Sequence, residues 1–204
     1  MKPKLGPWHY LCDVVFPPSA AALAVRSASL EDLNDLYKPT YTTDIEYLVS
    51  YQEKLVRSLI HEAKFHYNQH AYALLASLIA THLKQEPHTV VPIPLSPQRF
   101  RERGYNQCTE ILTRAVRQCQ TLKINEKILR RNRNTKPQTE LSKVERLQNV
   151  ANAFTVPNRY QSAVVGQNIL IIDDVVTTGA TLKAAAAAIA TYKPASIRLL
   201  ALAH

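Results

Sequence analysis

The sequence predicts an α/β fold in which a mainly parallel central sheet is flanked by helices, and three observations support this class. Residues 169–172 (Ile-Leu-Ile-Ile) are apolar without alternation, as in a parallel strand covered on both faces. The alanine-rich residues 182–189 strongly favour a helix. Residues 196–203 then predict a last strand, and strand, helix and strand in this order form a right-handed βαβ unit by default.

Composition limits the kind of protein and its ligands. The 204 residues, 46% of them hydrophobic, suffice for one substantial core and a small appendage. No apolar run approaches the roughly 20 residues of a membrane span, and the first residues lack the apolar part of a secretory signal. We therefore expect a cytoplasmic protein without a membrane partner. The net charge of +9 favours polyanions, either polyphosphate or nucleic acid.

Cysteines and histidines give no recognised metal pattern. Cys12, Cys108 and Cys119 are odd in number and form no CxxC pair, so we expect free thiols and neither a disulfide framework nor a zinc ribbon. His66 and His70 have i,i+4 spacing, and His61 lies nearby. No acidic or thiolate partner with recognised zinc spacing joins the three histidines, so surface or partly buried histidines are predicted.

The first half of the chain predicts an appendage followed by a strand and two helices. Residues 1–43 are poorly patterned, apart from a helix-favouring stretch at 20–24 and a capped turn or short helix at 29–32. We assign residues 1–43 to an N-terminal appendage or hood and residues 44–204 to the main domain. Residues 44–50 predict a strand, and 52–64 and 71–83 have helical periodicity.

Arginines follow the next predicted strand. Residues 89–94 predict a short parallel strand that ends in a proline-restricted bend at Pro94. Arg99, Arg101 and Arg103 are expected to converge in a loop before Gly104. Asn106 can then cap a helix whose apolar stripe buries Cys108 and Cys119. In a parallel sheet this arginine loop lies at the same edge as the carboxyl end of strand 169–172.

A basic stretch without acids occupies the middle of the chain. Residues 122–129 predict a short helix or strand, and residues 130–139 then carry four basic side chains and no apolar residue. We expect a mobile loop there.

The strand of residues 169–172 leads into a predicted phosphate and ribose site. Asp173 and Asp174 follow it at the edge where open α/β sheets bind ligands. The threonine loop, residues 177–181 (Thr-Thr-Gly-Ala-Thr), has only small or hydroxyl side chains, and a helix N-terminus after it can hold an anion without a lysine. The alternative is that the acids cap a turn before an ordinary helix. The sequence contains neither the GxGxxG motif of dinucleotide-binding proteins nor the GxxxxGK[ST] motif of P-loop proteins, which disfavours these two classes of phosphate-binding protein.

Residues 168–181 resemble the 5-phosphoribosyl-1-pyrophosphate (PRPP) binding motif of type I phosphoribosyltransferases. The resemblance implies that Asp173 and Asp174 hold the ribose hydroxyls and that the threonine loop binds the 5′-phosphate. The residues implied for ribose and 5′-phosphate binding are Asp173, Asp174, Val175, Val176, Thr177, Thr178, Gly179, Ala180 and Thr181.

Three separated segments resemble the ComF family of phosphoribosyltransferase-like proteins. The first is a lysine after a helix, Lys64, with a solvated helix-end lysine as the alternative. The second is Pro92-Ile-Pro94 followed by an arginine-rich Gly-Tyr-Asn-Gln turn. The third matches the family at Arg131, Arg133, Thr135, Gln138, Leu141, Arg146, Asn149, Ala153 and Phe154.

The ComF resemblance implies a type I phosphoribosyltransferase fold for residues 44–204. It places Arg131 and Arg133 in a catalytic loop that acts with the two aspartates. It implies pyrophosphate binding by Pro94, Arg99, Arg101, Arg103, Gly104 and Lys64. The four-cysteine zinc ribbon with which ComF proteins commonly begin has no counterpart here, because only Cys12 precedes residue 108.

The resemblance predicts a Mg²⁺-dependent phosphoribosyltransferase that moves the phosphoribosyl group of PRPP to an unidentified nitrogen nucleophile and releases pyrophosphate. Mg²⁺ is expected to bind chiefly through PRPP, with Asp173 and Asp174 as the side chains able to join its coordination. The alternative is a non-catalytic sensor or adaptor in DNA uptake that keeps the fold and binds single-stranded DNA on its basic face. Because a homodimer is common among relatives, this chain could form one. The sequence does not identify the nitrogen acceptor.

Overall fold

The computed structural model of the protein describes residues 18–42, 44–83, 88–132 and 153–204. In chain order its elements are α2 (Ala20–Ser27), α3 (Leu30–Asp35), β1 (Thr40–Thr42), β2 (Ile45–Val49), α4 (Lys54–Phe65), α5 (Gln69–His82), β3 (His88–Pro92), α6 (Pro97–Arg103), α7 (Gln107–Gln118), β4 (Leu122–Ile124), β5 (Arg130–Arg131), β6 (Phe154–Thr155), the 3₁₀ helix η2 (Asn158–Tyr160), β7 (Asn168–Val175), α9 (Ala180–Ala190) and β8 (Ser196–Ala203).

A mainly parallel sheet organises the fold, which confirms the predicted α/β class. In the described part of the chain, six strands form one sheet in the order β1-β2-β8-β7-β3-β4, and β5 pairs with β6 in a second sheet. Within the larger sheet only β1 runs antiparallel to its neighbour. β7 is therefore an interior strand between β8 and β3.

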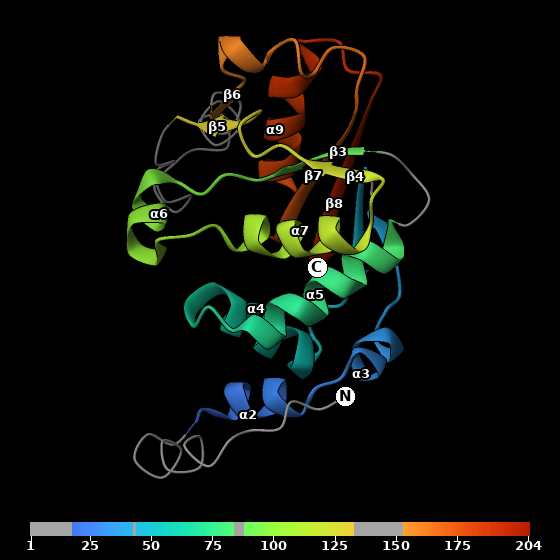
Figure 1. Cartoon of the computed structure of the whole chain (residues 1–204), viewed down its shortest axis with the longest axis vertical. Coiled ribbons are helices and arrows are strands. Elements are labelled where there is room, and N and C mark those ends of the chain that lie inside the picture. The colour runs from blue at the N-terminus through green and yellow to red at the C-terminus, as the bar shows by residue number, and fades with distance from the viewer. Residues whose placement is uncertain (1–17, 43, 84–87, 133–152) are drawn as a thin grey trace.

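Helices cover both faces of the sheet, as Figure 1 shows, with α4, α5 and α7 on one side and α9 on the other. Leu170 and Ile172 of β7 pack in the core cluster of α4, α5 and α7. Ile169 and Ile171 pack in the cluster of α9. All four side chains are buried, because successive residues of a strand point to opposite faces and both faces are covered. The continuous apolar run is explained by this double burial.

The described part of the N-terminal segment packs against the main body. Val25 and Leu33 are fully buried in the core cluster that contains α4 and α5. β1 pairs with β2 in antiparallel register, Thr40 opposite Tyr47. The predicted domain boundary between residues 43 and 44 therefore falls between two paired strands, and a hood role for this segment stays a prediction.

Several local predictions agree with the structure. Ser29 and Asp32 form a reciprocal capping box at α3, which confirms the capped short helix. Asn106 caps α7 by accepting a hydrogen bond from the Cys108 amide at 3.0 Å. Cys108 and Cys119 are buried free thiols, whereas Cys12 lies outside the described residues. Among the described residues, no helix is both long and apolar enough to cross a membrane.

Candidate functional site

Two adjacent carboxylates lie near the carboxyl end of β7, at the predicted edge of the sheet. Asp174 is buried and Asp173 is half-buried. Burial, followed by the negative charge of Asp174, raises the pKa of the Asp173 carboxyl to about 7, despite the positive charges of Lys64 and Arg131. A carboxyl that is costly to ionise near neutral pH is typical of a functional site, because folding alone gains nothing from it.

Donors from two helices and the backbone fix Asp174. The ammonium group of Lys64, in the last turn of α4, lies 3.0 Å from Asp174 Oδ2. Gln107 Nε2 donates to the same oxygen at 2.8 Å, and the amide of Val175 donates to Oδ1 at 2.7 Å. The Lys64 side chain is only 19% exposed, so the alternative of a solvated lysine at the helix end is wrong.

The two carboxylates suit Mg²⁺, whereas the neighbouring thiol does not. Cys108 Sγ lies 3.9 Å from Asp173 Oδ1, and Cys108, Asp173 and Asp174 place ligand atoms within 4.8 Å of one another. Burial, then the charges of Asp174 and Asp173, raise the pKa of the Cys108 thiol, which therefore keeps its proton. Mg²⁺ prefers oxygen ligands and retains several waters. The donor set thus fits an ion held by few protein oxygens.

The threonine loop connects β7 to the N-terminus of α9. Thr177 and Thr178 are exposed, and Gly179 adopts the left-handed conformation with a φ of 75°. Gly179, the N-cap residue of α9, has no side chain to cap the helix, and the Ala180 amide makes only a long hydrogen bond, 3.5 Å, to Thr178 Oγ1. The first amide groups of α9 therefore lie beside the loop, as an anion site would require. These positions agree with the predicted anion site at a helix N-terminus.

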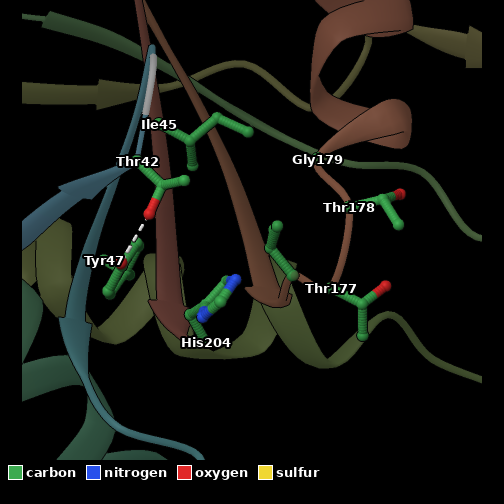
Figure 2. A pocket seen from close by; sticks show the side chains of 8 residues that line it. Thr42, Ile45, Tyr47, Thr177, Thr178, Gly179 and His204 are labelled. Atoms are coloured by element: carbon green, nitrogen blue, oxygen red, sulfur yellow. Dashed lines mark hydrogen bonds between the residues drawn. The ribbon is translucent and has the colours of Figure 1, made fainter.

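A small pocket lies on one side of this loop, between it and β2 (Figure 2). Its volume of about 40 Å³ is far below the roughly 300–1,000 Å³ of typical ligand pockets. Figure 2 shows the hydroxyls of Thr177 and Thr178 pointing away from Tyr47 and His204, which stack at 4.7 Å on the opposite wall. An anion bound by the loop would therefore lie on the outer side, where the hydroxyls point.

The prediction that three arginines converge in a loop is wrong, because residues 97–103 form helix α6. Ser96 caps the helix, Pro97 occupies its first position and Gly104 ends it with a φ of 77°. Arg101 lies about 200° around the helix from Arg99, so the two cannot share one face. Arg99 and Arg101 are exposed.

Arg103 contacts two neighbouring side chains. Its guanidinium lies 5.0 Å from the centre of the Phe65 ring and donates to Gln107 Oε1 at 3.0 Å. Through Gln107, Arg103 belongs to the hydrogen-bonded group that ends at Asp174. Pro94 lies between β3 and α6, as the predicted bend requires.

Arg131 lies in a strand and not in a loop. It belongs to β5, opposite Phe154 of β6, whose ring centre is 5.4 Å from its guanidinium. Burial and the charge of Arg99 lower the pKa of Arg131, while the charge of Asp173 raises it. Arg99 and Asp173 therefore lie close enough to Arg131 to interact with it electrostatically. Arg133 and the family-matching positions 135–149 lie outside the described residues.

Comparison with known proteins supports the same kind of domain. A model described as "Phosphoribosyl transferase domain" matches residues 109–204. Competence protein F of Haemophilus influenzae is 33% identical over 102 residues, which are 50% of this chain and 44% of that protein. Competence protein ComFC of Bacillus subtilis is 37% identical over 97 residues, 48% of this chain and 36% of that protein. These matches support a phosphoribosyltransferase-like protein of the ComF kind.

Other matches extend the comparison. DNA utilization protein YhgH of Escherichia coli K12 is 32% identical over 132 residues, which are 61% of this chain and 56% of that protein. The chain thus spans about half the length of the curated relatives it matches. A solved structure titled as an analysis of an invariant aspartic acid in HPRTs, an alanine mutant, aligns at 14% identity with a TM-score of 0.36, over 82% of this chain and 72% of that chain.

The sequence did not identify two residues of the candidate site, Gln107 and Cys108. Gln107 closes the Gly-Tyr-Asn-Gln turn and is 4% exposed, with its amide on Asp174. Its signal was present, because Gln107 lies four residues before Ile111 and therefore on the apolar face of this amphipathic helix. Cys108 was predicted only as a buried thiol, and its proximity to Asp173 depends on the packing of α7 against β7.

Proposed function

We propose that the chain binds PRPP and transfers its 5-phosphoribosyl group to a nitrogen nucleophile, with release of pyrophosphate. The observation that carries the proposal is the junction of β7 and α9. Two carboxylates near the end of β7 are followed by the threonine loop, with its left-handed Gly179, and then by the N-terminus of α9. Carboxylates accept hydrogen bonds from the two hydroxyls of a diol, and a helix N-terminus binds a phosphate. The two groups of this junction therefore suit the ribose hydroxyls and the phosphate of one sugar phosphate.

In this proposal Asp173 and Asp174 accept hydrogen bonds from the ribose hydroxyls, and the threonine loop holds the 5′-phosphate. The pyrophosphate lies toward α6 and Arg131, whose positive charges stabilise it as it leaves. The bond from C1 to the pyrophosphate oxygen breaks, a bond from C1 to nitrogen forms, and the nucleophile releases its proton to solvent. Such chemistry depends on positioning and on charge stabilisation by fixed groups.

Mg²⁺, when bound with PRPP, would neutralise part of the polyphosphate charge. Asp173 is the side chain placed to join its coordination, because Asp174 already accepts from Lys64, Gln107 and the Val175 amide. Lys64 and Gln107 then act as positioning residues that keep the Asp174 carboxylate aligned with the sugar.

The direct test is calorimetric titration of the purified chain with PRPP, with and without Mg²⁺. We expect one PRPP per chain, with affinity that depends on Mg²⁺. Ribose 5-phosphate serves as the control and should bind at least about tenfold more weakly, since it lacks the pyrophosphate that the arginines and Mg²⁺ contact. Absence of PRPP binding in both conditions would overturn the proposal, and observed binding would justify a screen of nitrogen acceptors by pyrophosphate release.

A second candidate function is binding of single-stranded DNA. It is favoured by the net charge of +9 and by the name of one relative, DNA utilization protein YhgH. We expect a labelled oligonucleotide to bind with an affinity that falls steeply with salt, because neutralised phosphates release counterions. Binding that persists at saturating PRPP indicates a separate surface, whereas displacement by PRPP places the DNA phosphates in the same site. No binding at low salt rejects this candidate.

A further inference from the structure

A buried carboxylate oxygen near the end of α4 has no hydrogen-bond partner among the described residues. It is Oε1 of Glu62, a residue that is 3% exposed. The other oxygen, Oε2, accepts a hydrogen bond from Asn68 Nδ2 at 3.1 Å, which fixes the plane of the carboxylate. Burying a carboxylate oxygen without a partner costs free energy. A bound cation would remove this cost, so Glu62 Oε1 is a candidate ligand atom for one.

Two histidines point ring nitrogens at this oxygen. His61 Nδ1 lies 4.0 Å from Glu62 Oε1, and His66 Nε2 lies 3.9 Å from it. The three ligand atoms all lie within 4.8 Å of one another. The two histidine side chains are 51% and 55% exposed, so an ion can reach them from solvent and their rings can adjust.

We propose that His61, Glu62 and His66 bind a borderline divalent transition-metal ion of the Zn²⁺ class. Such an ion binds imidazole nitrogen and carboxylate oxygen tetrahedrally at about 2.0–2.2 Å, which places its ligand atoms roughly 3.3–3.6 Å apart. The two histidine-to-glutamate separations, 4.0 and 3.9 Å, exceed this range by a few tenths of an ångström, and rotation of the two exposed imidazole rings would close all three separations. Two imidazoles with one carboxylate select against Mg²⁺ and Ca²⁺, which prefer oxygen alone.

The surroundings of this three-residue cluster fit a metal centre. Asn68 holds the far oxygen of Glu62, as outer-shell donors orient ligating carboxylates. Asn68 also caps α5 with its side-chain oxygen, so the ion would tie the end of α4 to the start of α5. Three protein ligands leave at least one position for water.

This cluster flanks Lys64, a residue of the proposed PRPP site, which lies two residues from Glu62 and two from His66. Lys64, which reaches Asp174, sits between Glu62 and His66 in the last turn of α4. Phe65 contacts His61 at 5.0 Å between ring centres and also stacks against Arg103. A bound ion would therefore hold the helix end that presents Lys64. The proposal does not depend on PRPP binding, because the ligands belong to a different cluster.

The spacing of histidines in the sequence did not predict this three-residue cluster. His66 and His70 have the i,i+4 spacing, yet His70 Nε2 lies 2.9 Å from the Ala28 carbonyl oxygen and takes no part. The prediction of surface histidines is confirmed for His61 and His66, but it overlooked Glu62, which adjoins His61 and lies four residues before His66.

The test is titration of the chelator-treated full chain with ZnCl₂ by calorimetry, and with Co²⁺ by visible absorption. We expect one ion per chain and a Co²⁺ spectrum without thiolate charge-transfer bands. His66→Gln and Glu62→Gln should each weaken binding by at least about 10- to 100-fold, the cost of losing even an outer-shell partner. His70→Gln, which keeps a donor for the Ala28 carbonyl, should bind like the wild type.

Three outcomes would overturn the metal site. They are absence of binding by the wild type, equal affinity in the wild type and His66→Gln, and a thiolate spectrum, which would place the ion on cysteine. Circular dichroism of each variant establishes that it is folded. If Glu62→Gln does not fold, His66→Gln decides, because its side chain is 55% exposed and its replacement leaves the core intact.

Discussion

Asp173→Asn is expected to abolish Mg²⁺-dependent PRPP binding and, in the same protein, to raise the free energy of unfolding at pH 8. Binding is lost because the proposed contact to the ribose and the ion needs a carboxylate. Stability rises because the wild-type protein must ionise a carboxyl whose pKa is raised to about 7 by burial and by Asp174. A residue that lowers stability while serving a ligand is the signature of a functional site.

The pH window of the stability effect follows from the direction of the pKa change. In the unfolded chain the carboxyl titrates near its ordinary value of 3.8, and in the folded chain near 7. The folded state binds more protons between these values, so the wild type loses stability as pH rises from about 4 to about 7. The asparagine variant does not titrate. We expect its advantage to be small at pH 4 and to reach the order of 1–4 kcal/mol at pH 8.

Urea unfolding of both proteins at pH 4, 6 and 8 measures this difference, and calorimetry measures PRPP binding. Asp44→Asn is the matched control, because the Asp44 side chain is 76% exposed and its surface ion pair with Lys183, at 3.5 Å, contributes little to stability. The control should change neither quantity. Lower stability of Asp173→Asn at pH 8 would contradict the electrostatic account, and retained PRPP affinity would contradict the ribose role.

Local sequence determined the elements that could be predicted. The run of four apolar residues required a strand buried on both faces, and β7 has that burial. The predicted last strand has the bounds of β8. The packing of the N-terminal segment could not be predicted, because it depends on contacts with distant parts of the chain. Val25 and Leu33 are ordinary in local context, and only their packing against α4 and α5 makes them core residues.

The candidate site was predicted where it is contiguous and missed where it is assembled from distant parts. The two aspartates and the threonine loop adjoin one another in the chain. The pairs Lys64–Asp174 and Gln107–Asp174 join residues far apart in sequence, and spacing cannot reveal them. The arginine helix was a different failure, since Ser96, Pro97 and Gly104 are its start and stop signals and could have been recognised.

Gly179→Ala is expected to destabilise the protein by about 2–5 kcal/mol and to weaken PRPP binding. Two effects add. The backbone at Gly179 has a φ of 75°, which costs a residue with a Cβ roughly 1–2 kcal/mol. A Cβ there would also clash with the side chain of Ile45, which is 4% exposed and cannot swing into solvent. Overpacking of this kind costs about 1–3 kcal/mol.

Gly166→Ala separates the two effects. Gly166 has a φ of 66°, but no atom lies within 4 Å of the position of an added Cβ, so this variant bears the backbone cost alone. Urea unfolding should therefore rank Gly179→Ala as the less stable variant, and equal losses would show that Ile45 does not crowd the loop. Adding Ile45→Val removes the clashing Cδ1 and should reduce the cost of Gly179→Ala. Such coupling would mean that β2, through Ile45, supports the loop that the proposed function assigns to the 5′-phosphate.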